Sequence, residues 1–291
     1  MSDQLIKSIA YDGQIRIYVA DATETVKEAQ ERHDTWSNAT AALGRTLIAT
    51  GLIGATLDGG DTITTRIQGD GPLGYIVADG NEHGEVKGYV QNPHISLNLN
   101  EENKIDVKGA VGTQGILAVT KDIHMREPSV GSVPLISGEI AEDFTYYMAS
   151  SEQTPSSFGL SVLVNPDESV ESAGGFMIQV LPGVEDETLD KIEQNLTDLP
   201  PISRLMNEGK TSEDILNLLA IDGEPKVLAS MPINFKCDCS KEKFASGLAS
   251  LGDPEIQKII EEDGEAEVVC HFCQNTYHYS KDELESIKEQ A

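Results

Sequence analysis

The pattern of apolar and polar residues along the chain changes from segment to segment, between the two-residue repeat of strands and the repeat of about 3.6 residues of helices. The segment "QIRIYVAD" (14–21) alternates and is rich in β-branched residues, which predicts a strand. Apolar residues then recur at helical spacing over 22–33 and again over 37–57, which predicts two helices. The second of these is dense in Ala, Leu and Ile, so we expect a helix that is buried on most sides. A further helix is predicted over 137–155.

Several short apolar runs bounded by Gly, Asp and Pro predict additional strands. They lie within 61–93 and at 115–123, 158–167 and 174–183. Strands and helices are mixed without a regular strand–helix–strand alternation. The predicted fold class of this part is therefore α+β.

From about residue 184 to 220 the apolar residues recur at helical spacing. This predicts a series of short helices, each acidic on one side. Thr211 and Asp214 have the spacing of a capping box. The aliphatic positions of the segment include Leu189, Ile192, Leu196, Leu199, Ile202, Leu205, Ile215 and Leu219. Helices this short are marginal alone and need a surface for their apolar faces. The segment is either a linker packed on the core or a part that can undock.

The length of 291 residues favours more than one domain. We expect an α+β core domain over 1–183, a helical linker over 184–231 and a small C-terminal module over 232–291. Within the module, helices are predicted at 241–251 and 254–262, followed by a strand and a helix near the end.

The charge limits the partners of the protein. It carries 49 acidic and 21 basic residues, a net charge of −28, and no five-residue window holds more than two Lys or Arg. Such a surface repels nucleic acids. The longest apolar stretch, "LIATGLIGATL", has 11 residues, whereas a bilayer span needs about 20. The start of the chain has no signal-peptide pattern. We expect a cytoplasmic protein with neither a membrane nor a nucleic acid as partner.

The four cysteines lie in two motifs near the C-terminus. Cys237 and Cys239 form a Cys-x-Cys motif, and Cys270 and Cys273 form a Cys-x-x-Cys motif after 30 intervening residues. In a reducing compartment, paired cysteines favour metal or redox chemistry over structural disulfides. Four thiolates are a ligand set that suits one tetrahedral zinc ion. A module this small has a thin core and often depends on such a metal.

Other kinds of zinc site fit these thiols less well or equally well. A catalytic zinc needs an open coordination position, which four thiolates close. We recognise no catalytic motif, so the protein is predicted not to be an enzyme. His271 and His278 are near but are expected at the surface. A zinc ribbon that binds nucleic acid has the same ligands, but the net charge of −28 argues against nucleic-acid binding. A purely structural zinc site stays open.

The cysteine pattern behind a long cysteine-free core, with "GRTLIATGLIGATL" and "QGDGPLG" in the first domain, resembles the bacterial heat shock protein 33 family. These are redox-regulated holdase chaperones, and the resemblance covers essentially the full length. It implies an ATP-independent chaperone that is inactive while Cys237, Cys239, Cys270 and Cys273 bind zinc. Oxidants would form disulfides between Cys237 and Cys239 and between Cys270 and Cys273, release zinc, unfold the module and destabilise the linker.

The resemblance also implies partners. The active form, often a dimer, would hold unfolding client proteins until ATP-dependent foldase chaperones take over. The eight aliphatic linker positions are candidates for client binding. The alternative is a zinc-stabilised adaptor that binds a partner protein and has no redox switch.

Overall fold

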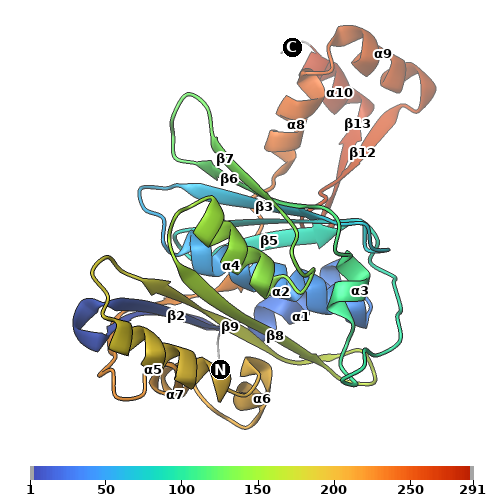
Figure 1. Cartoon of the computed structure of the whole chain (residues 1–291). Helices are drawn as coiled ribbons and strands as arrows, with labels where there is room; N and C mark the ends of the chain where they lie inside the picture. The colour runs from blue at the N-terminus through green and yellow to red at the C-terminus, as the bar shows by residue number, and fades with distance from the viewer. Residues whose placement is uncertain (1–2, 289–291) are drawn as a thin grey trace. The chain divides into compact units, whose positions relative to one another are not determined.

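The computed structural model describes residues 3–288, which separate into two compact units (Figure 1). The first unit ends at Lys236 and the second begins at Cys237. Helices and strands are mixed throughout the first unit, which confirms the α+β class. No helix among the described residues is long and apolar enough to span a bilayer. The division into a core domain over 1–183, a linker over 184–231 and a module over 232–291 stays a prediction.

A central helix, α2 (Ser37–Gly54), lies between the two sheets of the first unit (Figure 1). It contacts β4 (Tyr75–Asn81) of one sheet and β8 (Ser156–Val164) of the other. All of its residues except Ser37 and Arg45 are buried. The predicted helix buried on most sides is confirmed, and it ends three residues before the predicted boundary.

The first sheet has five antiparallel strands. In spatial order they are β10 (Lys226–Pro232), β1 (Gln4–Ala10), β2 (Ile15–Asp21), β9 (Val170–Val180) and β8. The short helical turn η1 (Tyr11–Gly13) joins β1 to β2. The edge strand β10 belongs to the segment predicted as a helical linker, so that prediction is wrong beyond residue 219. Its residues are exposed except for half-buried Met231, so their local pattern gives no sign of pairing with β1.

The second sheet has six strands and is antiparallel except for the pairing of its first two. In spatial order they are β11 (Asn234–Phe235), β5 (Glu85–Val90), β4, β3 (Thr62–Gln68), β6 (Ile116–Asp122) and β7 (Ser129–Pro134). Helices α1 (Thr23–His33) and α3 (Val107–Val111) pack against α2. β11 is formed by the last residues of the first unit, so the chain is anchored in this sheet immediately before Cys237.

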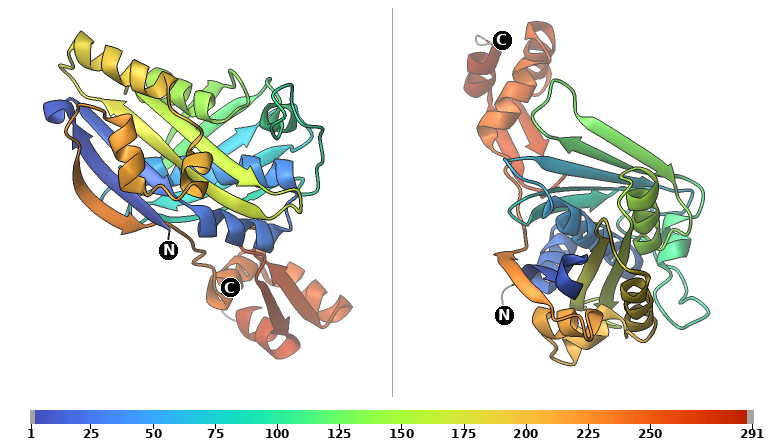
Figure 2. Two further views of the ribbon diagram at one scale, coloured as in Figure 1. Left: turned by 90° about the horizontal axis from the view of Figure 1, so that it is seen from below. Right: turned by 60° about the vertical axis from the view of Figure 1, so that its left-hand side comes forward.

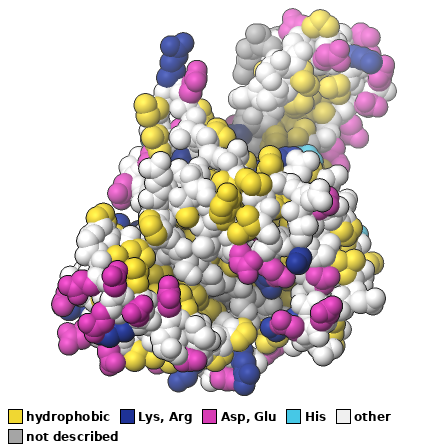
Figure 3. Space-filling model, in the orientation of Figure 1, with side chains coloured by type: hydrophobic (Ala, Val, Ile, Leu, Met, Phe, Trp, Pro, Cys, Tyr) yellow, Lys and Arg dark blue, Asp and Glu magenta, His cyan; other side chains and the backbone are white. Residues whose placement is uncertain are grey.

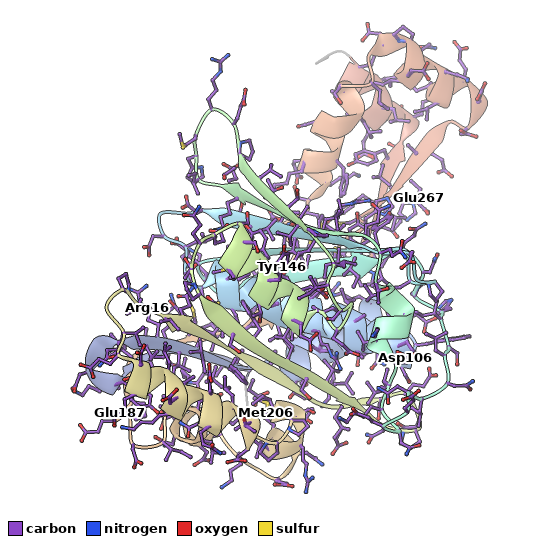
Figure 4. The ribbon with its side chains drawn as sticks, in the orientation of Figure 1. Arg16, Asp106, Tyr146, Glu187, Met206 and Glu267 are labelled. Atoms are coloured by element: carbon purple, nitrogen blue, oxygen red, sulfur yellow. The ribbon has the colours of Figure 1, made fainter. Side chains whose placement is uncertain are left out.

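The helix predicted over 137–155 is shorter in the structure. It is α4 (Ala141–Ser150), which carries the half-exposed Tyr146 (Figure 4). The Asp143 carboxylate accepts hydrogen bonds from the backbone N–H groups of Ile136, Ser137, Gly138 and Ile140, at 2.8–3.1 Å. These bonds hold the preceding residues as a loop. Asp143, the third residue of the helix, thereby caps its start, and the helix begins at Ala141 instead of at residue 137.

Three helices cover the outer face of the five-stranded sheet (Figure 2). They are α5 (Asp186–Thr197), α6 (Ile202–Asn207) and α7 (Ser212–Leu219). Their buried residues form one apolar cluster with alternate residues of β2 and β9: Ile15, Ile17, Val19, Phe176 and Ile178 from the sheet, and Ile192, Ile202, Leu205, Ile215, Leu216 and Leu219 from the helices. The first unit itself thus provides the surface that these short helices need.

The polar sides of these helices carry charge. Glu187 lies on the solvent side of α5, while the partly buried Met206 of α6 packs against the apolar cluster (Figure 4). Figure 3 shows acidic side chains gathered over the α5 region. The predicted capping box is confirmed, because the backbone N–H of Thr211 donates to Asp214 at 2.9 Å and that of Asp214 donates to the Thr211 hydroxyl at 3.1 Å.

The second unit is a small α+β module. Its elements are α8 (Lys241–Ala249), α9 (Asp253–Glu262), β12 (Glu265–Val269), β13 (Thr276–Ser280) and α10 (Lys281–Lys288). The predicted helices and the late strand are confirmed, and β12 is an additional strand. The buried core consists of Ile256, Ile260, Tyr279, Leu284 and Ile287. So few buried apolar side chains give a module of this length little stability of its own.

Candidate metal centre

The four cysteines reach one point from two loops of the second unit. Cys237 and Cys239 lie just ahead of α8, and Cys270 and Cys273 lie in the turn that joins β12 to β13. The turn is closed by two backbone hydrogen bonds of 2.8 and 2.9 Å, one accepted and one donated by Cys270. The Sγ atoms of all four residues lie within 4.8 Å of one another.

The arrangement of the sulfurs fits a single tetrahedral metal ion. Four sulfurs about 2.3 Å from a central zinc ion lie about 3.8 Å from one another. The Sγ atoms of Cys237 and Cys270 are 3.8 Å apart, and those of Cys239 and Cys273 are 3.3 Å apart. Cys270 and Cys273 are buried and the other two are half-buried. The donor set would hold one zinc ion with little change in the positions of the side chains.

The acid–base properties of the thiols also favour a cation. Burial, reinforced by the neighbouring sulfurs, raises the pKa of Cys237 to about 11 and also raises the pKa of Cys273. Burial acts to raise the pKa of Cys239 too, but hydrogen bonds from Tyr277 and Cys273 outweigh it and the pKa is lowered. Four thiolates this close repel one another, whereas a bound divalent ion stabilises all of them in the deprotonated form.

A tyrosine contacts one of the thiols. The Tyr277 hydroxyl lies 3.1 Å from the Sγ atom of Cys239, and this contact raises the pKa of Tyr277 to about 12. Its ring packs against Phe244 of α8, with the centroids 5.2 Å apart. Sequence analysis did not identify Tyr277. The available signal was its position in a predicted strand, four residues after the last cysteine.

The two histidines near the motifs lie outside the group of four thiols. Both are exposed, and Nδ1 of His278 lies 3.5 Å from a Glu267 carboxylate oxygen. The site described by the structure is therefore made of sulfur ligands.

Seven of the eight aliphatic linker residues lie in the apolar cluster beneath α5, α6 and α7. Ile192, Ile202, Leu205, Ile215 and Leu219 are buried there, and Leu196 and Leu199 are partly buried. Leu189 is half-buried outside that cluster. In this state five of the seven side chains are buried and two are partly buried, and their role as a client surface stays a prediction.

Comparisons with known proteins agree with one another over the whole chain. The family model described as Hsp33 protein matches residues 3–280. A 33 kDa chaperonin of Enterococcus faecalis is 56% identical over 291 residues, which cover 100% of this chain and 98% of the relative. The 33 kDa chaperonin of Bacillus licheniformis is 54% identical over 99% of each chain.

A solved structure supports the same conclusion. The crystal structure of a 33 kDa chaperonin from Thermotoga maritima, a heat shock protein 33 homologue, superimposes with a TM-score of 0.92 at 38% identity. The match covers 100% of this chain and 99% of the other. Since the family model and these relatives extend over nearly all of the sequence, the chain belongs to the Hsp33 family of chaperones.

Proposed function

We propose that the protein is a redox-regulated, ATP-independent holdase. In the reduced state Cys237, Cys239, Cys270 and Cys273 hold one zinc ion and the protein is inactive. Peroxide then oxidises the thiolates of each motif, so that two thiolates, one peroxide and two protons give one disulfide and two waters. Zinc is released because a disulfide sulfur is no longer a thiolate ligand. The module over 232–291 then unfolds, and the linker over 184–231 leaves the core.

The observation that supports this proposal most directly is that four thiols lie within 4.8 Å of one another in a module whose apolar core has five buried residues. Structural zinc contributes on the order of 10–16 kcal/mol in small peptides. Whole domains have stabilities of only about 5–15 kcal/mol. Loss of the metal is therefore large enough to unfold a module of this kind, and oxidation of the ligands is a direct way to lose it.

The client surface follows from the packing of α5, α6 and α7. When these helices undock, the apolar face of β2 and β9 and the apolar faces of the helices become exposed together. An exposed apolar surface of this extent binds unfolded polypeptides and also promotes self-association. We therefore expect the active form to be a homodimer in the cytoplasm that passes its clients to ATP-dependent foldases. The net charge of −28 helps to keep such a surface soluble.

One observation favours the alternative, a zinc-stabilised adaptor without a switch. Immediately before Cys237, Ile233 and Phe235 are buried, and the backbone N–H of Lys236 donates to the carbonyl oxygen of Val86 at 2.8 Å. These contacts anchor the chain between the helices and the cysteines. If the anchor holds after the module unfolds, α5, α6 and α7 stay docked and no client surface appears.

Peroxide treatment of the zinc-loaded protein under mild heat distinguishes the two functions. We expect zinc release, loss of helicity and suppression of the aggregation of a thermally unfolding client enzyme, all reversed by a thiol reductant. Retention of zinc, or loss of zinc without any gain in holdase activity, would support the adaptor. Cys237→Ser is the companion variant, and it should weaken zinc binding and make the module sensitive to proteases without oxidant.

A further inference from the structure

The Tyr277 hydroxyl touches two atoms of the same cysteine. It lies 3.1 Å from Sγ of Cys239 and 3.1 Å from the carbonyl oxygen of Cys239. The ring is fixed from two directions, since Tyr277 is paired with Val268 in the hairpin of β12 and β13 and its ring packs at a tilt of 44° against Phe244 of α8. The hydroxyl can therefore exchange one acceptor for the other without movement of the ring.

A phenol has a single proton to donate, so only one of the two acceptors receives the full hydrogen bond. A carbonyl oxygen is neutral, whereas a thiolate is an anion, and hydrogen bonds to ionised groups are roughly twice as strong as neutral ones. While Cys239 is a thiolate, the proton therefore goes to sulfur. Once Cys239 is part of a disulfide, the sulfur is a poor acceptor and the proton returns to the carbonyl oxygen.

We propose that Tyr277 is a positioning residue that stabilises the Cys239 thiolate as a metal ligand and slows its attack on peroxide. A thiolate that accepts a hydrogen bond has less electron density to give to an oxidant. The same bond fixes the direction of the sulfur lone pairs toward the metal position, as outer-shell partners of metal ligands do. The oxidation part of this inference rests on the proposed redox function, and the metal part does not.

The chain contains a matched control two residues away on the same strand. The Tyr279 hydroxyl donates a 2.6 Å hydrogen bond to the carbonyl oxygen of Lys241. Tyr277→Phe removes a hydroxyl that touches a ligand sulfur and keeps the ring against Phe244. Tyr279→Phe removes a hydroxyl whose hydrogen bond joins β13 to a backbone carbonyl oxygen at the start of α8. Comparison of the two separates an effect on the sulfur from general loosening of the module.

Zinc affinity is measured in reducing buffer by competition with a chromogenic chelator. We expect Tyr277→Phe to bind zinc about tenfold more weakly than the wild type, in the range seen for loss of outer-shell hydrogen bonds. Tyr279→Phe should change the affinity much less. In the cobalt-loaded protein, the thiolate-to-cobalt charge-transfer band should shift to longer wavelength in Tyr277→Phe alone, because the sulfur regains electron density.

The rate of zinc release by peroxide should increase several-fold in Tyr277→Phe. Unchanged zinc affinity and an unchanged cobalt band would overturn the assignment, as would equal changes in both variants. If peroxide releases zinc from the wild type but induces no holdase activity, the proposed function fails. The effect of Tyr277→Phe on zinc affinity would nevertheless establish its positioning role.

Discussion

The Tyr11 hydroxyl donates a 2.8 Å hydrogen bond to the carbonyl oxygen of Ile221, which joins the end of β1 to the segment after α7. It also accepts a 3.2 Å hydrogen bond from the Asn195 side chain of α5. The contact leaves no room for a side chain at Gly223, where an added Cβ would lie 2.6 Å from the Tyr11 ring. One residue near the start of the chain thus holds two of the three helices.

Tyr11→Phe should therefore favour undocking of α5 and α7. The variant leaves the Ile221 carbonyl without its partner and removes one of the two hydrogen bonds that the Asn195 amide donates, the other going to the Leu219 carbonyl. This loss costs about 1 kcal/mol. We expect faster hydrogen exchange in α5 and α7 and a lower peroxide concentration for activation, with unchanged zinc affinity. Tyr146→Phe on α4 is the control, since its ring is 36% exposed and lies away from these helices. Identical exchange rates in Tyr11→Phe and the wild type would contradict this role.

Ile215→Ala tests the apolar cluster beneath the helices more severely. Ile215 is fully buried in that cluster, and truncation of such a residue costs about 2–5 kcal/mol. Because α7 has only eight residues, a loss of this size should undock it even while zinc is bound. The reduced variant should bind an apolar fluorescent dye and suppress client aggregation.

The matched control is Ile221→Ala, which makes the same chemical change at a site that is 49% exposed. It should alter stability by no more than about 0.5 kcal/mol, as surface substitutions usually do. A reduced Ile215→Ala protein that stays inactive and binds no dye would show that these helices do not control the client surface.

The sequence predicted those elements of the fold whose pattern is local. The buried helix α2 was recognisable because nearly every residue in it is small or apolar, and α7 because its capping box and aliphatic stripe are adjacent. The pairing of β1 with β10 was not recognisable. The two strands are distant in sequence, and the residues of β10 are exposed apart from half-buried Met231, so no hydrophobic alternation marks it.

The same distinction applies to the site. The four cysteines could be assigned to one centre because their spacing is a property of the sequence. The contact of Tyr277 with Cys239 depends on the register of β12 and β13 and on the position of α8. The surface on which α5, α6 and α7 dock was likewise not predictable. One set of alternate residues of β2 and β9 packs against these helices, and the sequence does not show which layer covers which face of the sheet.

Zinc affinity should depend steeply on pH. The pKa of Cys237 is raised to about 11 and that of Cys273 is also raised, so both thiols are protonated near neutral pH without metal and must lose their protons to bind it. Falling pH therefore weakens binding, by about tenfold per pH unit for each proton released. From pH 8 to pH 7 the Kd for zinc should rise at least about 100-fold. Cys237→Ser should reduce this slope by about one proton, and a Kd that does not change with pH would contradict the assignment.

The pairing of the disulfides affects how far oxidation opens the module. The two sulfur contacts of 3.3 and 3.8 Å both join one motif to the other. A disulfide between motifs would close a loop of roughly 35 residues and stabilise the module by about 4 kcal/mol. A disulfide within a motif closes only three or four residues and stabilises it by about 2 kcal/mol. Two bonds within motifs therefore offset about 4 kcal/mol of the roughly 10–16 kcal/mol lost with zinc, and two bonds between motifs offset about 8 kcal/mol.

Disulfides within the motifs, between Cys237 and Cys239 and between Cys270 and Cys273, are the pairing that the resemblance to the Hsp33 family implies, and they are the pairing that leaves the module less stable. Peptide mapping by mass spectrometry of the oxidised, alkylated protein distinguishes the two patterns, and a time course identifies the motif that reacts first. The double variant Cys237→Ser/Cys270→Ser leaves Cys239 and Cys273, whose disulfide would tie the start of α8 to the hairpin. Because this variant has lost two zinc ligands, its reduced form should be protease-sensitive, and oxidation should make it protease-resistant and lower its holdase activity. Disulfides between motifs in the active wild-type protein would contradict the proposed unfolding, because they hold together the two loops that zinc release must separate.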